Sequence, residues 1–275
     1  MRAYLAPLEG ITTHVYRNAY HHHFRPLDKY FTPFIVPASK RPLRTRERRD
    51  VDPENNKGLP VIPQILTNDA AGFLETAEAL EALGYTEVNL NLGCPSGTVT
   101  SRGKGAGFLK DPDALDAFLE QIFDGCRLKI SLKTRLGWAD PEEVWEILNV
   151  IDRYPVSEWI LHPRVRQEFY RGETHRDIFL EVLKKSSHPM IYNGNLFTAE
   201  DIRQICGEAE AVCAGMQEQD HFAGVMSCQD HFAGVMPGRG LIAQPALWSH
   251  YCGETVTISQ LKDFHDEIYD GYHEI

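Results

Sequence analysis

Residues 87–95 read EVNLNLGCP, and this stretch decides the expected fold. Apolar and polar side chains alternate strictly over residues 87–92, which predicts a strand with one face of each kind. Residues 128–133 (LKISLK) show the same alternation. We expect the apolar faces to pack against surrounding helices. The polar faces, which carry Asn91 and Lys133, are then expected to point into the inside of a barrel.

Short apolar runs recur along the chain and alternate with segments of helical period. Strands are expected at 3–6, 30–36, 61–66, 87–92, 128–133, 157–162, 190–193 and near 232–236. Helices are expected at 69–83, 111–124, 141–153, 175–186 and 198–206. Asp69, Asp111 and Asp140 are placed to cap three of these helices. Eight strand–helix units in about 250 residues predict an α/β fold, a (β/α)8 TIM barrel. A doubly wound open sheet is the alternative.

The composition is that of an ordinary globular protein. The 275 residues are 43% hydrophobic and 24% charged, which suffices to bury a core. No apolar run is long enough to span a membrane, and no segment resembles a signal peptide. Six cysteines occur without any C-x-x-C pair, so neither a metal site nor a disulfide framework is expected. A cytoplasmic, reducing compartment fits this cysteine usage.

The charge is distributed unevenly. A formal net charge of −11 argues against non-specific wrapping of nucleic acid. Residues 40–49 (KRPLRTRERR) nevertheless carry six cations against one anion. This segment is either a solvated loop or a local contact for a polyanion.

One octapeptide occurs twice. Residues 219–226 (QDHFAGVM) recur unchanged as residues 229–236. Two copies are too few for a solenoid, so a local tandem duplication is the expected origin. Only the second copy leads into residues 237–240 (PGRG), and the eighth strand is therefore assigned to it.

Cys94 directly follows a predicted strand and precedes a proline and a glycine-rich loop, residues 103–107 (GKGAG). Barrel enzymes build their sites at the C-terminal ends of their strands. Asn91, Lys133 and His162 are expected at the same end. A reactive thiol and a buried structural cysteine both remain open for Cys94 on position alone. Lys133 points inward and needs an anion, because a buried unpaired ammonium is costly.

Taken in order and spacing, the motifs of the chain resemble those of the tRNA-dihydrouridine synthases, which are FMN-dependent barrel reductases. The resemblance covers about residues 3–250. It rests on residues 6–12 (APLEGIT), 16–17 (YR), 63–65 (PQI), 91–95 (NLGCP), 133–135 (KTR), 162–167 (HPRVRQ), 170–172 (YRG), 193–195 (NGN) and 238–240 (GRG). Each short motif is weak alone, but the whole series is specific.

The resemblance implies an oxidoreductase that reduces a tRNA uridine to 5,6-dihydrouridine, with FMN bound at the barrel mouth and NADPH, or NAD(P)H more broadly, as reductant. FMN is expected rather than FAD because no G-x-G-x-x-G follows a strand. The implied cofactor-binding residues are Pro7, Leu8, Glu9, Gln64, Lys133, His162, Asn193, Gly194, Asn195, Gly238 and Arg239. Cys94 is implied as the proton donor to the uracil ring. The implied substrate-binding residues are Asn91, Arg135, Arg164 and Arg166.

The expected division is an FMN-binding catalytic barrel at 1–250 and the start of a C-terminal helical tRNA-binding region at 251–275. Family members usually carry a longer helical domain there, so this extension is expected to be truncated. A basic rim on the mouth is expected from residues 40–49 and from later loops that carry Arg102, Lys104, Arg135, Arg164, Arg166 and Arg171. Two other functions stay open: a flavin barrel acting on a free pyrimidine such as dihydroorotate, and a catalytically impaired barrel that only binds flavin or RNA. The oligomeric state is not predicted.

Overall fold

The computed structural model describes residues 1–38, 42–218 and 231–273. The strands are β1 (Arg2–Leu5), β2 (Lys29–Phe31), β3 (Val61–Ile62), β4 (Gln64–Ile65), β5 (Glu87–Leu92), β6 (Lys129–Gly137), β7 (Trp159–Val165), β8 (Met190–Tyr192) and β9 (Phe232–Val235). They pair in parallel in the order β3-β2-β1-β9-β8-β7-β6-β5-β4. Only Pro63 separates β3 from β4, so the two ends of this order belong to one interrupted strand. The sheet therefore closes, and the predicted (β/α)8 barrel is confirmed.

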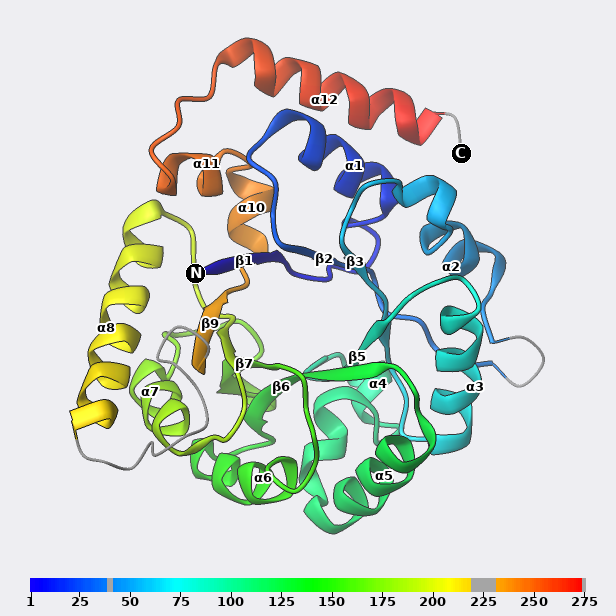
Figure 1. Cartoon of the computed structure of the whole chain (residues 1–275), viewed down its shortest axis with the longest axis vertical. Helices are drawn as coiled ribbons and strands as arrows, with labels where there is room; N and C mark the ends of the chain where they lie inside the picture. Colours follow the sequence, from blue (N-terminus) through cyan, green and yellow to red (C-terminus); the bar gives the residue numbers. More distant parts are fainter. Residues whose placement is uncertain (39–41, 219–230, 274–275) are drawn as a thin grey trace.

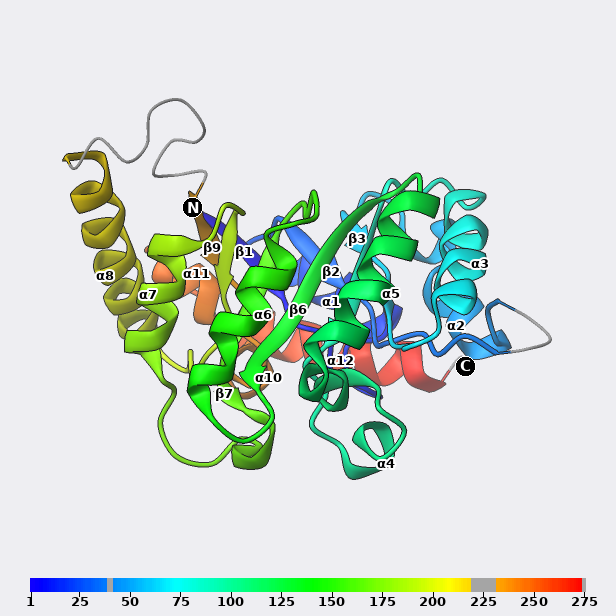
Figure 2. The same ribbon diagram turned by 90° about the horizontal axis from the view of Figure 1, so that it is seen from below.

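Helices surround the strands (Figure 1), and Figure 2 shows the same barrel from the side. The α-helices are α1 (His14–His23), α2 (Thr45–Asp50), α3 (Ala70–Glu81), α4 (Gly97–Thr100), α5 (Pro112–Gly125), α6 (Val144–Ile151), α7 (Arg176–Lys185), α8 (Ala199–Glu218), α10 (Arg239–Ala243), α11 (Leu247–Tyr251) and α12 (Ile258–His273). The 3-10 helices are η1 (Pro53–Asn56), η2 (Gly105–Lys110), η3 (Pro141–Glu143) and η4 (Arg166–Glu168). Among the described residues, no helix combines the length and apolar character needed to cross a membrane.

Three helices begin where their sequence predicts. Asp69, Asp111 and Asp140 each accept a hydrogen bond from a backbone N–H of the first turn that follows. A carboxylate at the N-cap satisfies one of the N–H groups that lack a partner within the helix, and it also opposes the positive end of the helix dipole. These caps fix where the chain leaves each strand end and enters the outer ring.

Prolines shorten two predicted strands. The strand expected at 30–36 ends at Phe31, and Ile35, beyond Pro33, pairs with Ile65 through an isolated bridge. Pro63 divides the strand expected at 61–66, which gives nine short strands in place of eight. In both cases the proline has no backbone N–H to donate to the ladder.

Three other elements are longer in the structure than the sequence predicted. The strands expected to end at residues 133 and 162 continue to Gly137 and Val165, which pair with each other. The added residues include arginines, which do not read as strand interior. The helix expected at 198–206 extends to Glu218, because the alanine-rich continuation has high helix propensity. The basic segment contains the short helix α2 where only a loop was expected.

Apolar side chains form two layers. The larger layer fills the space between strands and helices and includes Val88, Leu90 and Leu132. A smaller cluster fills the inside of the barrel, namely Tyr4, Ala6, Phe31, Ile62, Ile160, Ile191, Ala233 and Met236. The predicted division of β5 and β6 into an outer apolar face and an inner polar face is confirmed.

The C-terminal segment lies across α1 (Figure 1). Phe264 of α12 packs edge-on against Tyr16 and Phe24, with ring centroids 5.6 and 4.9 Å apart. The second copy of the repeated octapeptide provides β9, as predicted. The first copy, residues 219–226, and residues 40 and 41 lie outside the described residues.

Candidate active site at the barrel mouth

Strand alternation carries three cationic side chains and a histidine to the C-terminal end of the barrel interior. Lys133 and Arg135 come from β6, and His162 and Arg164 come from β7. A cavity of about 60 Å³ lies at this mouth. Its lining is Ala6, Pro7, Leu8, Gly93, Lys133, Arg135, His162, Tyr170, Asn193, Gly194, Gly238 and Arg239. The structure thus brings together eight of the eleven residues predicted to bind a cofactor.

Lys133 lies in this mouth without a carboxylate. Its Nζ donates to Asn193 Oδ1 at 2.6 Å, and none of the ion pairs within the described ranges includes it. Burial, with a smaller effect of the neighbouring Arg135 charge, lowers the pKa of Lys133 to about 7. Such an ammonium is stabilised by an anionic ligand. Asn193 in turn donates to Met236 O at 2.6 Å, which fixes the carboxamide that holds the lysine.

His162 is a neutral neighbour of these cations. Burial, followed by the charges of Arg135, Lys133 and Arg164, lowers its pKa well below the ordinary value. Its Nε2 lies 3.2 Å from Arg164 Nη1, and this nitrogen accepts because a guanidinium only donates. His162 therefore adds a polar ring to the mouth without adding charge.

Arg135 and Arg164 are buried and donate hydrogen bonds to backbone carbonyls, and they are not exposed on the rim. This corrects the prediction that placed them on loops. Arg135 donates to Gly93 O, Val165 O and Phe169 O at 2.9, 3.1 and 2.7 Å. Both arginines lie within strands that are longer than predicted. Their burial follows from the inward direction that strand alternation gives them.

Arg164 ties the loop after β7 to the loop after β8. It donates to Arg171 O at 3.1 Å, to Gly172 O at 2.6 Å and to Asn195 Oδ1 at 3.1 Å. With its contact to His162, four of the five guanidinium N–H groups have partners. Asn195 therefore supports the mouth from outside the cavity, although sequence placed it among the cofactor residues.

Aromatic rings lie beside two further arginines at this end of the barrel. Arg239 lies 4.7 Å from the ring centroid of Tyr170, and Arg166 lies 4.7 Å from those of Trp138 and Phe169. Tyr170 is 48% exposed, so one face of this layer is open to solvent. Sequence reasoning did not assign the rings of Trp138 and Phe169, which have no signature beyond their loop positions.

Cys94 is half-buried at the end of β5. Asn91 Oδ1 accepts from the backbone N–H groups of Gly93 and Cys94 at 3.1 and 2.9 Å. Burial raises the pKa of the Cys94 thiol, and the backbone at Ser96 and the charges of Arg135 and Lys133 oppose this only in part. The sulfur is therefore held in place and protonated at neutral pH.

A chain of side-chain amides links Cys94 to the barrel interior. Asn91 Nδ2 donates to Gln64 Oε1 at 2.7 Å, and Gln64 Nε2 donates to Asn89 Oδ1 at 2.7 Å. Asn89 then donates to Ser131 Oγ at 3.0 Å. Asn89 and Ser131 were not predicted as site residues. The signal was available, because both share the inward parity of Asn91 and Lys133.

Glu9 does not line the mouth cavity. Its Oε1 lies 3.4 Å from Arg46 Nη2, and burial raises its pKa despite that cation. Glu9 therefore belongs to a neighbouring surface formed by α2. In the part of the chain that the structure describes, no group of three or more His, Cys, Asp and Glu side chains is arranged to hold a metal ion.

The fold and this site define the class of protein: a (β/α)8 barrel whose C-terminal mouth is lined by cations and prepared for an anionic ligand. The chain belongs to the dihydrouridine synthase family, whose model matches residues 4–264. This family of oxidoreductases contains the tRNA-dihydrouridine synthases, so the predicted family is confirmed.

Individual relatives agree with the family match. The tRNA-dihydrouridine(16) synthase of Vibrio vulnificus is 28% identical over 225 residues, which cover 77% of this chain and 69% of the relative. The Escherichia coli K12 enzyme of the same name is 29% identical, over 74% of this chain and 67% of the relative. The Salmonella typhimurium enzyme is 31% identical, over 71% and 65%. Among solved structures, a phosphoribosylanthranilate isomerase from Pyrococcus furiosus matches 98% of this chain and 99% of its own with a TM-score of 0.48 and 14% identity.

Proposed function

We propose that this protein reduces a uridine in tRNA to 5,6-dihydrouridine, with FMN bound at the barrel mouth, NADPH as reductant and Cys94 as proton donor. The observation that carries the proposal is the unpaired Lys133 beside Arg135, in the mouth of a chain that belongs to the dihydrouridine synthase family. An anionic group at this point offsets the cost of burying the cations.

The residues of the mouth fit an FMN molecule. Lys133 and His162 line the mouth cavity and would hold the flavin ring. Gln64 is fully buried and does not line the cavity, so it would support the site through its hydrogen bond with Asn91. Gly194 and Gly238 line the mouth and would present backbone to a phosphate. At Gly194 a Cβ would also clash with the Tyr192 hydroxyl. Small-molecule sites measure about 300–1,000 Å³, whereas the enclosed cavity is about 60 Å³. The enclosed cavity alone would not hold FMN, which would extend from it into the open mouth beside the exposed Tyr170.

Bound reduced FMN supplies the hydride that carbon 6 of uracil receives. Cys94 then gives its proton to carbon 5: the S–H bond breaks, a C–H bond forms, and the thiolate regains a proton from solvent. The raised pKa of Cys94 keeps the thiol protonated until that step, and general acids contribute about 10²–10⁴-fold. Lys133 and Arg135 stabilise the thiolate that follows. Asn91 holds the loop of Cys94 and has one N–H left for the uracil edge.

A uridine reaches this mouth only after it leaves its stack in the tRNA. Arg166, stacked between Trp138 and Phe169, is a proposed contact for the extruded nucleotide. The proposed tRNA contacts outside the mouth are Arg44 and Arg49, which line the neighbouring cavity beside α2, and the helical segment at 251–275. In this division residues 1–250 carry the chemistry and residues 251–275 contribute to RNA binding.

The test is to release the cofactor from the purified protein, identify it by mass, and assay dihydrouridine in unmodified tRNA incubated with NADPH. We expect FMN and new dihydrouridine. FAD, or no flavin in the folded protein, would contradict the cofactor. Flavin reduction without any dihydrouridine, together with turnover of dihydroorotate, would favour a reductase of free pyrimidines.

A further inference from the structure

A second and larger cavity, of about 470 Å³, lies beside the mouth and shares no residue with its lining. Its walls are the start of α1, the short helix α2, the loop after β2 and Tyr272 at the end of α12. The loop after β1 joins the two cavities, because Leu8 lines the mouth and Glu9 lines this second cavity. We call it the α2 cavity.

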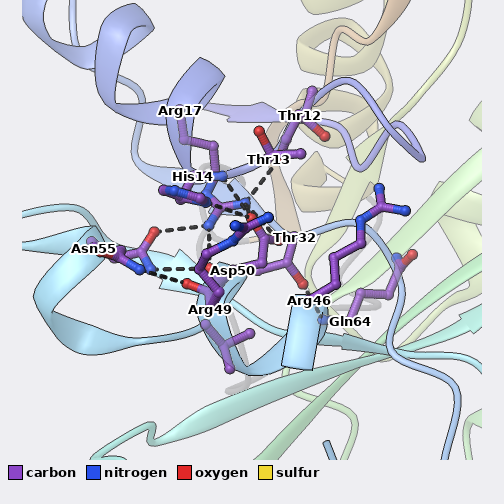
Figure 3. A network of polar contacts seen from close by, with 12 residues as sticks. Thr12, Thr13, His14, Arg17, Thr32, Arg46, Arg49, Asp50, Asn55 and Gln64 are labelled. Atoms are coloured by element: carbon purple, nitrogen blue, oxygen red, sulfur yellow. Dashed lines mark hydrogen bonds and ion pairs between the residues drawn. The ribbon is translucent and has the colours of Figure 1, made fainter. Parts of the chain in front are cut away.

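A buried ion pair between Arg17 and Asp50 holds α2 in place at the wall of the cavity (Figure 3). Arg17 is fully buried and donates to Thr12 O at 2.8 Å and to Asp50 O at 2.7 Å. Its Nη1 also lies 3.2 Å from Asp50 Oδ2, and its Nη2 donates to Asn56 Oδ1 at 2.8 Å. Asp50 ends α2 and accepts from His14 N at the start of α1 at 2.6 Å. The arginines of α2 therefore project from a fixed backbone rather than from a solvated loop.

The carboxylates around the α2 cavity are mostly occupied. Asp50 is neutralised by Arg17, and Glu47 accepts the backbone N–H groups of Val36 and Arg44 at 3.2 and 2.8 Å. Glu9 lies 3.4 Å from Arg46. Each carboxylate thus already has a partner within the cavity wall.

Arg44 and Arg49 also line the cavity, and neither takes part in an ion pair among the described residues. Two guanidinium groups without a carboxylate, on a fixed wall, suit a phosphate, which accepts paired N–H donors.

The rest of the wall suits a planar base. Phe34, Ile35 and Val51 give it apolar surface, and Tyr272 is 41% exposed. The hydroxyl of Tyr272 contacts Thr13 Oγ1 at 2.7 Å and donates to Ile11 O at 3.2 Å, which fixes its ring. An exposed, fixed aromatic ring beside arginines is the arrangement on which single-stranded nucleic acid stacks. The volume is within the range for small-molecule sites, about 300–1,000 Å³.

We propose that the α2 cavity binds one unpaired nucleotide of the RNA substrate, with its phosphate on Arg44 and Arg49 and its base against the side of Tyr272. The inference rests on the proposed function, because it takes the RNA to be the strand whose uridine enters the mouth. The shared loop after β1 lets one strand occupy both cavities. The same chemistry would also accept a free nucleotide, including part of a nicotinamide cofactor, and the experiment separates the two.

The test uses a double variant that combines Arg44→Gln and Arg49→Gln. The control variant is Arg48→Gln. Arg48 is on the same helix, does not line the cavity, and lies 3.9 Å from Asp52. Affinity is measured for unmodified tRNA, a short single-stranded RNA, AMP and NADP⁺. We expect the double variant to bind both RNAs about tenfold more weakly. The slope of log affinity against log salt should fall by about 0.7 for the lost phosphate contact. Arg48→Gln should match the wild type.

Equal RNA affinity and salt slope in the double variant and in Arg48→Gln would overturn the proposal. Loss of AMP or NADP⁺ binding with unchanged RNA binding would also overturn it, since the cavity would then serve a free nucleotide. Tyr272→Leu adds an independent arm, in which we expect about fivefold weaker binding of the short RNA. Wild-type affinity for the short RNA in this variant would contradict the role of the ring.

Failure of the proposed function gives a different result. A wild-type protein that reduces no uridine, but whose RNA binding depends on Arg44 and Arg49, would sink the proposed activity and support the cavity. Uridine reduction with unchanged KM in the double variant would overturn the cavity and leave the activity standing. FMN content is measured in every variant and should stay constant, because neither arginine lines the mouth.

Discussion

The two ends of the barrel differ in whether their buried cations have carboxylate partners. At the N-terminal end, Glu158 is 3% exposed and contacts Arg2, the Tyr4 hydroxyl at 2.6 Å and Lys29 at 2.8 Å. Lys29 also pairs with Glu87 at 2.8 Å. Two cations thus meet two carboxylates there. At the C-terminal mouth, Lys133, Arg135 and Arg164 meet backbone carbonyls and side-chain amides, and none of them forms an ion pair with a carboxylate in the part of the chain that the structure describes.

This difference separates stability from ligand binding. The paired end already has its compensation inside the protein, so removing one member leaves a buried charge and costs stability. The positive charge of the mouth has no counter-charge until an anion binds. Removing Lys133 should therefore stabilise the ligand-free protein and weaken only the binding of the anionic ligand. Substitutions at the two ends should therefore affect different measurements.

The largest expected effect lies at the mouth. Cys94→Ala should lower uridine reduction in tRNA by about 10²–10⁴-fold, because the proton donor is lost. Flavin reduction by NADPH should continue, and single-turnover assays of both steps separate them. Cys126→Ala is the matched control, a half-buried cysteine outside the mouth, and should behave as wild type. Unchanged tRNA turnover in Cys94→Ala would mean that another group supplies the proton.

The next effect lies at the paired end. Glu158→Gln should lower the free energy of unfolding by about 3 kcal/mol, because it removes the charge of a buried carboxylate that accepts from Arg2, the Tyr4 hydroxyl and Lys29. FMN affinity should not change. Urea unfolding measures the first quantity and flavin fluorescence the second. Glu181→Gln, in an exposed pair with Lys184, is the control and should change stability by less than about 0.5 kcal/mol. A loss of FMN binding in Glu158→Gln would break the comparison between the two ends.

Lys133→Met should raise the free energy of unfolding, whereas Glu158→Gln should lower it. Burial holds the folded pKa near 7, below the ordinary value of 10.5, so the folded state without FMN binds fewer protons than the unfolded chain. The resulting penalty is full below pH 7 and disappears as the pH rises toward 10.5. Lys133→Met should thus raise the unfolding free energy of the FMN-free protein by about 1–3 kcal/mol at pH 6.

The same variant should bind FMN more weakly, because it removes the charge that faces the anionic ring. Urea unfolding of the FMN-free proteins at pH 6, 7, 8 and 9 measures the gain, which should shrink toward pH 9. A variant that is less stable than wild type at pH 6 would show that Lys133 has a compensating partner. Wild-type FMN affinity would remove Lys133 from the cofactor site.

The series of eight strand–helix units predicted the barrel. Period-two alternation predicted the inward direction of Asn91 and Lys133, because strand geometry fixes side-chain direction. It did not predict what those side chains contact. The bond from Lys133 to Asn193 joins residues sixty positions apart, and no local pattern encodes it. Arg135 was expected on an exposed loop because a charged residue past a strand end reads as solvated. Its three carbonyl partners are Gly93 after β5, Val165 at the end of β7 and Phe169 after η4. The pairing of β6 with β5 and β7 brings them near.

The smallest expected effect again lies at the paired end. Tyr4→Phe removes one hydrogen bond to Glu158 and leaves the contacts of that carboxylate with Arg2 and Lys29. The expected loss is about 1 kcal/mol in the free energy of unfolding. Burial, with the Glu158 charge, raises the pKa of Tyr4, so its hydroxyl remains a donor throughout the neutral range.

The loss in Tyr4→Phe should therefore be the same at pH 6 and at pH 9, in contrast to Lys133→Met. Urea unfolding at both values measures it, and Tyr269→Phe, on the exposed surface of α12, is the control. A loss that changes between the two pH values would mean that the paired end also contains a group that titrates there. The difference between an internally compensated end and a ligand-compensated mouth would then no longer hold.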